Sequence, residues 1–443
     1  MTTPPDFVHL HVHSQYSILD GQASIQKLVD KAMRDGQPGI ALTDHGNMFG
    51  IKEFYNYVKK VKGKYKAQAA EAEARLAALV DGSQAPADPA EIARCRAELA
   101  DLKRKAAFKP IIGSEVYVAR RRMQDKEGKP DQSGYHLILL AKNLKGYHNL
   151  IKIVSKAWTE GFYMRPRTDR VELEKYHEGL ICCSACLAGE VPRAITADDM
   201  QKAEEAILWH KKLFGDDYYL ELQLHPSGDP QKDADVYENQ LRVNKALLEL
   251  AAKFGVKYIC SNDVHFILAE DAVAHDHLIC LNTGRDLDDP NRMRYTFQEY
   301  LKSPEEMAAL FPDHPEALAT TLEIAAKCED YKLTHAPLMP NFPPPEDFKI
   351  DLAELRESFV KKIEDAELLA RIGACASVEE LERLVAHDKE LSDRLMVAKQ
   401  YCYLVDLTYK GAHRRYGEVL DEKVEQRLKY ELDTIEWMGF PGY

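Results

Sequence analysis

The feature that most constrains this chain is a set of nine side chains able to bind metal, spread over its first 265 residues. Each lies at or near the end of an apolar, strand-like run. They are His11, His13, Asp20, His45, Glu115, His136, Cys186, Asp263 and His265. The first pair lies in the alternating run FVHLHVHS, and the two-residue period of a strand points both imidazoles to the same face. Strands that carry functional groups at one common end predict a barrel of parallel strands.

Helical segments separate these runs and predict an α/β fold. The runs are GIALTDH, PIIGSEVYV, YHLILLA, GLICCSAC and YICSNDVH, and a striped segment such as SIQKLVDKAMRDG is typical of the helices between them. Residues 64–108 interrupt this order with two helical patterns around DGSQAPADPA, where Asp88 is a plausible N-cap before Pro89. We expect an inserted helical hairpin, either as a plain surface insertion or as a docking arm for a partner.

At 443 residues the chain is too long for one ordinary core, so a second domain is expected. The first would cover residues 1–270. From 271 to 443 the pattern becomes mostly helical, with the proline-rich connection PLMPNFPPPEDF inside it. The final EWMGFPGY leaves an apolar run unfinished, so the end looks cut rather than natural.

Composition predicts a soluble, cytoplasmic protein with reduced thiols. No apolar stretch approaches the roughly 20 residues of a membrane span, the N-terminus lacks a signal-peptide pattern, and the nine cysteines are irregularly placed. A net charge of −13 argues against indiscriminate nucleic-acid binding, although a metal-rich site supplies its own positive charge. Arg165, Arg167 and His225 are the candidates for contacts with an anionic substrate.

Nine donors exceed the four of a tetrahedral zinc site, so two or three divalent metals are expected. Imidazole with one thiolate favours zinc, whereas the carboxylates would accept manganese or iron. Such a cluster lowers the pKa of a bound water and supplies hydroxide to attack phosphorus, which makes all nine candidate catalytic residues for phosphoester hydrolysis. His9 shares the strand parity of His11 but would lie one layer deeper, and Ser14 either hydrogen-bonds a ligand or ends the strand.

With HLHVHS, TDHG, GSE, GYH, SAC and NDVH in this order, the chain resembles the polymerase and histidinol phosphatase (PHP) superfamily of metal phosphoesterases. Further stretches, among them LDGQASIQKLV, AKNLKGYHNLIKIVSKA and ELDTIEWMGFPGY, resemble the start of bacterial replicative DNA polymerase III alpha subunits. The resemblance implies a distorted seven-stranded PHP barrel with metals at its C-terminal rim. A partial, mostly helical α+β polymerase palm would follow, ending before the carboxylates that hold the polymerase magnesium ions.

Every position that matches a family ligand carries a residue able to ligate. The resemblance therefore implies a metal-dependent 3′-to-5′ exonuclease acting on DNA, within a polymerase whose full-length form would meet a sliding clamp and a proofreading subunit. Two alternatives stay open. The barrel could be a catalytically silent, metal-binding scaffold that docks the proofreading subunit, or a free-standing phosphatase for small molecules.

Overall fold

The protein is described by a computed structural model covering residues 7–80, 88–335, 338, 340, 342–361 and 363–443, without the side chains of 231 and 232. The chain divides into two compact units, Met1–Leu333 and Thr334–Tyr443. This division falls later than the expected boundary after residue 270, because the helices that follow residue 270 pack on the first unit. One of them lies directly against the last strand of its sheet.

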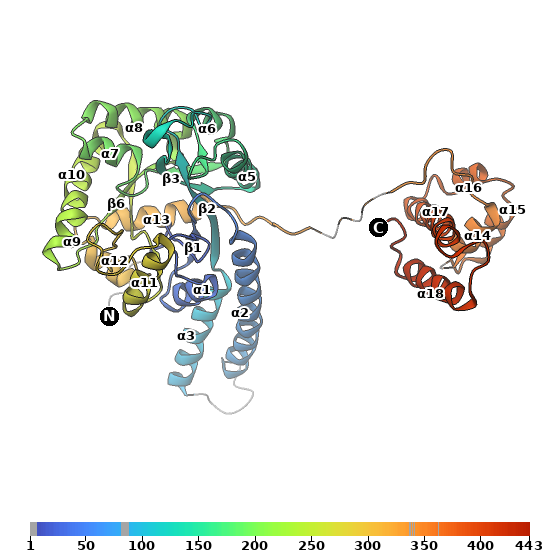
Figure 1. The fold of residues 1–443 in the computed structure, drawn as a ribbon. Coiled ribbons are helices and arrows are strands. Elements are labelled where there is room, and N and C mark those ends of the chain that lie inside the picture. The colour runs from blue at the N-terminus through green and yellow to red at the C-terminus, as the bar shows by residue number, and fades with distance from the viewer. Residues whose placement is uncertain (1–6, 81–87, 336–337, 339, 341, 362) are drawn as a thin grey trace. The chain divides into compact units, whose positions relative to one another are not determined.

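One curled, mixed sheet organises the first unit (Figure 1). Its strands are β1 (Gly39–Leu42), β2 (Lys109–Val118), β3 (Tyr135–Ala141), β4 (Arg167–Thr168), β5 (Leu180–Cys183), β6 (Tyr218–Gln223) and β7 (Lys257–Ser261). The order is β1-β2-β3-β5-β6-β7, with β4 pairing β2. The predicted α/β barrel architecture is confirmed.

The expectation that all strands run parallel is wrong for β3, which is antiparallel to both β2 and β5. A parallel neighbour needs a crossover, usually a helix, to carry the chain back. The connection between β2 and β3 holds only the four-residue helix α4 (Gly128–Asp131), so the chain turns back instead. The start of β3 therefore lies at the same rim as the ends of the parallel strands.

The N-terminal run joins the two ends of the sheet. On one side, the Ala41 N–H of β1 donates to the His9 carbonyl at 2.8 Å. On the other, the His13 N–H donates to the carbonyl of Val264, just beyond β7, at 2.7 Å. Val8 and Leu10 are buried in the inner core of the barrel. The sequence pattern FVHLHVHS therefore forms the closing segment of the barrel.

Two layers fill the inside of the barrel, because side chains two residues apart on a strand share a face. Ile138 and Tyr219 belong to a small apolar inner core. Two residues toward the rim, the same strand faces carry His136 and Glu221. The apolar layer thus forms the floor on which the polar rim rests.

Helices cover the sheet and extend from it. Those of the first unit are α1 (Ile25–Arg34), α2 (Ile51–Val80), α3 (Pro89–Ala106), α5 (Leu144–Thr159), α6 (Arg170–Tyr176), α7 (Glu190–Thr196), α8 (Met200–Phe214), α9 (Pro230–Asp235), α10 (Tyr237–Phe254), α11 (Ala272–Thr283), α12 (Pro304–Leu310) and α13 (Pro315–Lys327). Short 3-10 turns lie at η1 (Gly215–Asp217) and η2 (Ala269–Asp271). No helix in the described part of the chain is long and apolar enough to cross a membrane.

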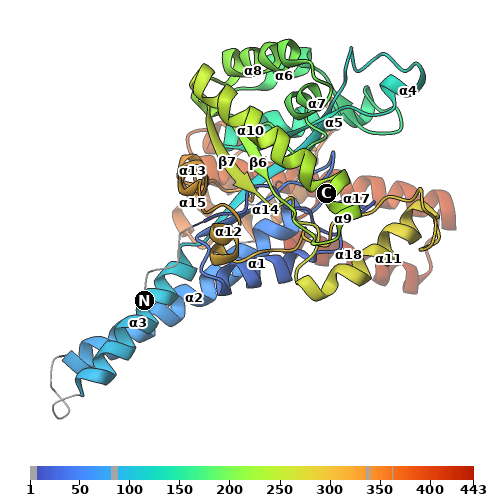
Figure 2. The same cartoon turned by 90° about the vertical axis from the view of Figure 1, so that its left-hand side faces the viewer.

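The expected hairpin is present as α2 and α3, which lie side by side and extend away from the sheet (Figure 1, Figure 2). Asp88 caps α3 as expected, its side chain accepting from the Ala90 N–H with Pro89 as the first helical residue. The predicted turn at 81–87 lies outside the described residues. The hairpin has a small core of its own, formed by Ala69, Ala72 and Leu99.

The second unit consists of helices around a separate core. They are α14 (Leu352–Val360), α15 (Ala366–Ala374), α16 (Val378–Val385), α17 (Lys389–Tyr416) and α18 (Glu422–Met438). Leu355, Phe359, Leu381 and Leu395 are buried in that core. Its assignment to the start of a polymerase palm stays a prediction.

Candidate metal centre

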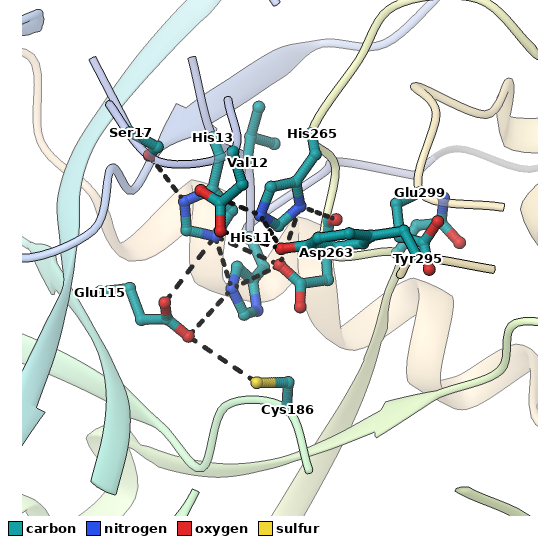
Figure 3. A network of polar contacts seen from close by, with 12 residues as sticks. His11, Val12, His13, Ser17, Glu115, Cys186, Asp263, His265, Tyr295 and Glu299 are labelled. Atoms are coloured by element: carbon teal, nitrogen blue, oxygen red, sulfur yellow. Dashed lines mark hydrogen bonds and ion pairs between the residues drawn. The ribbon is translucent and has the colours of Figure 1, made fainter. Parts of the chain in front are cut away.

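All nine predicted ligands come together at one rim of the barrel. Figure 3 labels His11, His13, Glu115, Cys186, Asp263 and His265 among them. His45 follows β1, Cys186 follows β5, and Asp263 and His265 follow β7. Glu115 lies within β2, and its bridge to His45 keeps these two side chains adjacent. The remaining donors come from the closing segment, the turn after it, and the start of the reversed strand β3.

Around His11 and His13 the donor atoms converge closely. The two Nε2 atoms are 3.1 Å apart. Oδ1 of Asp263 lies 3.1 Å from Nε2 of His11 and 3.2 Å from Nε2 of His13. Glu115 Oε1 lies 3.4 Å from His11 Nε2. Asp263 adopts a φ of 45°, a conformation that non-glycine residues rarely take and that occurs preferentially at functional sites.

Glu115 also connects this group to a second one. Its Oε2 lies 2.5 Å from Nδ1 of His45, and its Oε1 lies 2.8 Å from Nδ1 of His136. The Cys186 sulfur completes the group, at 3.8 Å from His136 Nδ1 and 3.9 Å from Glu115 Oε1. A carboxylate placed between two groups of imidazoles is suited to bridge two metal ions.

A third group surrounds Asp20. Its Oδ1 is 3.3 Å from Nε2 of His45, which is in turn 3.4 Å from Nε2 of His265. The His13 ring stacks on both of these imidazoles, with centroid distances of 3.9 and 4.4 Å. Tyr295, which the sequence reading did not select, donates its hydroxyl to Asp20 Oδ2 at 3.0 Å and lies 3.1 Å from His265 Nε2.

These donors fit a site for metal ions. Three overlapping sets each bring their ligand atoms within 4.8 Å of one another: His13 with His45 and His265, His11 with His13 and Glu115, and His45 with Glu115 and His136. Within the described part of this centre, three buried carboxylate oxygens contact imidazole nitrogens but accept no hydrogen bond, namely Asp20 Oδ1, Glu115 Oε2 and Asp263 Oδ1. Because burying an unsatisfied carboxylate oxygen is costly, cations at these positions would relieve the cost.

The electrostatics of the centre assign different protonation states to neighbouring groups. Burial opposes the charge on His11, yet Asp263 and Glu221 raise the pKa of its imidazole well above the usual value. Burial, together with two flanking imidazoles, lowers the pKa of His13 to about 3. Burial and two nearby carboxylates raise the pKa of the Cys186 thiol well above its usual range. A metal ion would therefore have to displace protons to bind here.

Surrounding side chains hold the ligands in place. The carboxylate of Glu221, a residue that the sequence reading missed, accepts from Nδ1–H of His11 at 2.6 Å and so directs Nε2 toward the centre. Ser17 Oγ lies 3.0 Å from Nδ1 of His13 and donates to Asp44 at 2.9 Å. Ser14 also donates to Asp44, at 2.9 Å, so it supports the ligands and is not one itself.

Three sequence-based candidates lie away from the ligand set. His9 is buried and donates its Nε2–H to the Lys302 carbonyl at 2.8 Å, so it does not join the metal ligands. Arg167 is wholly buried, and its guanidinium donates to the carbonyls of Gly161, Met123 and Asp125. The expectation that Arg167 contacts substrate is therefore wrong, because its guanidinium N–H groups donate to backbone carbonyls.

His225 is likewise placed below the rim. Its Nε2–H donates to the Asn262 carbonyl at 3.1 Å, and its Nδ1 accepts from Gln240 at 3.0 Å. With both ring nitrogens engaged and 3% of the residue exposed, its side chain is not available to a substrate, and the expected substrate contact is wrong. It instead supports the residue that precedes Asp263.

Arg165 is half-buried and, within the described residues, its guanidinium pairs with no carboxylate, so it remains a candidate for binding phosphate.

The chain is similar to known proteins over almost its whole length. A PHP domain model matches residues 9–225, and a bacterial DNA polymerase III alpha NTPase domain model matches residues 402–443. DNA polymerase III alpha subunits from Borreliella burgdorferi, Treponema pallidum and Thermus aquaticus are 38%, 35% and 34% identical to it, each over 99% of this chain. The matched parts make up 29%, 29% and 32% of those relatives, so the chain spans less than a third of their length. Across 99% of its length the chain therefore matches part of bacterial DNA polymerase III alpha subunits, and residues 9–225 of its first unit match the PHP domain.

Proposed function

We propose that this chain is the N-terminal region of a replicative DNA polymerase and that its PHP domain removes nucleotides from the 3′ end of DNA with the help of two or three divalent metals. The observation that carries this proposal is the convergence of all nine donors, with orphaned carboxylate oxygens, at one rim. Four further observations support it: the PHP match, the polymerase match at residues 402–443, the Glu115 carboxylate between two groups of imidazoles, and Arg165, which pairs with no carboxylate among the described residues.

Bound divalent metals lower the pKa of water and stabilise charge on phosphoryl oxygens, which is the chemistry that phosphodiester hydrolysis needs. The protein supplies the geometry. Glu221 orients His11, and Ser17 orients His13, so that both Nε2 atoms face the same point. Arg165 would hold the phosphate as a fixed cation. The Tyr295 hydroxyl donates to Asp20 and lies beside His265, so it would hold both ligands in position.

The wider assignments rest on the relatives. Polymerisation, with magnesium ions at palm carboxylates beyond this chain, belongs to the full-length polymerase in this proposal. DNA is the substrate, and a sliding clamp and a proofreading subunit are the partners expected of the full-length protein. The similarity of residues 402–443 to the polymerase family argues against a free-standing phosphatase for small molecules.

The first prediction tests the centre directly. Protein purified without chelator should contain at least two metal equivalents, and it should shorten single-stranded DNA from the 3′ end with zinc or manganese but not after chelation. Asp263→Asn should lower both metal content and cleavage, because Asp263 contacts two imidazoles. His314→Ala is the matched control, since this partly exposed side chain lies away from the rim.

Each outcome separates the alternatives. Cleavage by Asp263→Asn equal to that of the unchanged protein would indicate a contaminating nuclease. Full metal occupancy with no cleavage would contradict the exonuclease and support the metal-binding scaffold that docks a proofreading subunit. One metal equivalent or less after repletion would contradict the cluster itself.

A further inference from the structure

Three exposed aromatic side chains form a continuous surface beside the metal centre, although none of them belongs to the ligand set. Phe49, Trp158 and Phe162 are 54%, 40% and 45% exposed. Trp158 lies in the middle, with ring centroids 5.8 Å from Phe49 and 5.6 Å from Phe162, stacked on the latter at 22°. We call these three side chains the aromatic ledge. Scattered exposed apolar residues are ordinary, whereas contiguous ones mark binding surfaces.

The ledge is attached to the loop that carries a metal ligand. The indole N–H of Trp158 donates to the carbonyl of Gly46 at 2.8 Å, and Gly46 directly follows His45. Phe49 belongs to the same loop. Gly46 has a φ of 61°, and a Cβ there would lie 2.7 Å from Pro166, so the loop is packed tightly against the segment next to Arg165. The ledge is therefore held in a fixed position relative to the centre.

A cation belongs to the same loop as one residue of the ledge and acts on a ring beside the ligands. Arg165 follows Phe162 in the same loop, and its charge acts on the hydroxyl of Tyr117. The Tyr117 ring in turn contacts the rings of His45 and His136, at centroid distances of 6.2 and 5.1 Å. Aromatic rings followed by an unpaired cation are the pattern with which proteins bind single-stranded nucleic acid, because the rings stack on bases and the cation neutralises phosphate.

We propose that the aromatic ledge stacks the unpaired bases at the 3′ end of single-stranded DNA, while Arg165 binds the adjoining phosphate and presents the terminal phosphodiester to the metal centre. This inference rests on the proposed exonuclease, because it specifies the form of that enzyme's substrate. Bases inside a duplex are already stacked on one another and have no free face for the ledge. The ledge therefore selects frayed or mismatched ends over paired ones.

Binding measurements on the full 443-residue chain test the ledge without relying on cleavage. The probe is a labelled oligothymidine with phosphorothioate linkages, which keep it intact whether or not the centre hydrolyses DNA. A second probe of equal length and charge has abasic sites in its 3′ half. Trp158→Ala and Phe162→Ala should each weaken binding of the first probe about ten-fold, in the range expected for one stacked base, and leave the abasic probe unaffected.

Two further variants control for folding and position. Trp158→Phe keeps a stacking ring but loses the hydrogen bond to Gly46, so it should bind the first probe nearly as well as the unchanged protein. Trp437→Ala removes a 77% exposed indole from the second unit and should change nothing. Melting temperatures of all variants identify any loss that comes from unfolding.

The outcomes distinguish this inference from the proposed exonuclease. If Trp158→Ala binds the first probe as tightly as the unchanged protein, the aromatic ledge does not stack bases. The ledge would then be better explained as a surface for a protein partner. An equal loss for both probes would overturn it as well, because stacking requires bases. Base-dependent binding without cleavage of ordinary DNA would contradict the exonuclease alone.

Discussion

At the scale of single residues, some of the proposed ligands carry protons in the metal-free centre that they would have to lose when a metal ion binds. Burial opposes protonation of His45, but Asp20 and Tyr117 raise its pKa well above the usual value, as Asp263 and Glu221 do for His11. Both imidazoles are therefore charged at neutral pH in metal-free protein, and the thiol of Cys186 is protonated. To bind a metal ion, a histidine must be neutral and a cysteine must be a thiolate.

We therefore expect metal binding to release protons at neutral pH and metal affinity to rise with pH up to the raised imidazole pKa values. Isothermal titration with zinc in buffers of different ionisation enthalpy measures the number of protons released. The control is His210→Gln, which should release as many protons as the unchanged protein, because burial lowers the pKa of His210 to about 4 and its side chain hydrogen-bonds the carbonyl of Ala206 in α8, away from the centre. A zinc-binding enthalpy that does not change with the buffer would mean that no protons are released, and would contradict the protonation of His11, His45 and Cys186 in metal-free protein.

Two arginines two residues apart should behave in opposite ways when changed to alanine. Arg167→Ala removes a wholly buried guanidinium that donates to three carbonyls, so it should lower the free energy of unfolding by about 3 kcal/mol or more. Arg165→Ala should leave the unfolding midpoint nearly unchanged and weaken DNA binding. Chemical denaturation of both variants, followed by binding assays, provides the comparison. Equal stability of the two would contradict the structural role of Arg167.

The ligands could be predicted from the sequence because each lies at the start or end of an apolar run. Most of the residues that hydrogen-bond the ligands could not be predicted in this way. Glu221 gave a usable signal, since it alternates with Gln223 and His225 in ELQLH and so faces the interior with them. Tyr295 gave none, because it lies in an irregular loop without periodicity. Arg165 and Arg167 look equivalent in MRPRTD, and only tertiary packing separates the buried side chain from the accessible one.

At the scale of elements, the position of one histidine in the sequence also indicates the direction of β3. In GIALTDH and YICSNDVH the polar ligands follow the apolar run, whereas in YHLILLA the ligand His136 precedes it. A common rim then requires this strand to run in reverse, as the pairing of β3 with β2 and β5 shows. The long-range order of the strands, by contrast, depends on packing that no local pattern encodes.

The helical hairpin should be dispensable for the metal centre. Its outer part packs on itself through Ala69, Ala72 and Leu99, while the first half of α2 packs on the main core, through Ile51, Phe54, Val58, Val61 and Tyr65. Replacing residues 69–102 with a short glycine-containing turn should therefore leave metal content unchanged. Elemental analysis checks this, with circular dichroism showing the loss of helix. A loss of metal would mean that the outer hairpin supports the rim.

At the scale of the whole molecule, the two units have separate cores, and only the first holds the candidate centre. Metal that binds only folded protein stabilises it, by about 4 kcal/mol at a free concentration one thousand times the dissociation constant. Calorimetry should therefore show two transitions, and chelation should lower the midpoint of one by several degrees and leave the other unchanged. The isolated 334–443 segment identifies the insensitive transition. Equal shifts in both would contradict a stabilising effect confined to the first unit.

The closing segment of the barrel has a consequence for the order of events during synthesis. His11 and His13 are synthesised well before the Val264 backbone that pairs with this segment, and His45 and His265 lie 220 positions apart. Contacts so distant along the chain form slowly, because a long loop must close before they contribute. The imidazoles of this segment therefore wait for their partners through much of translation, and metal capture at the proposed centre would be a late event that reports completion of the barrel.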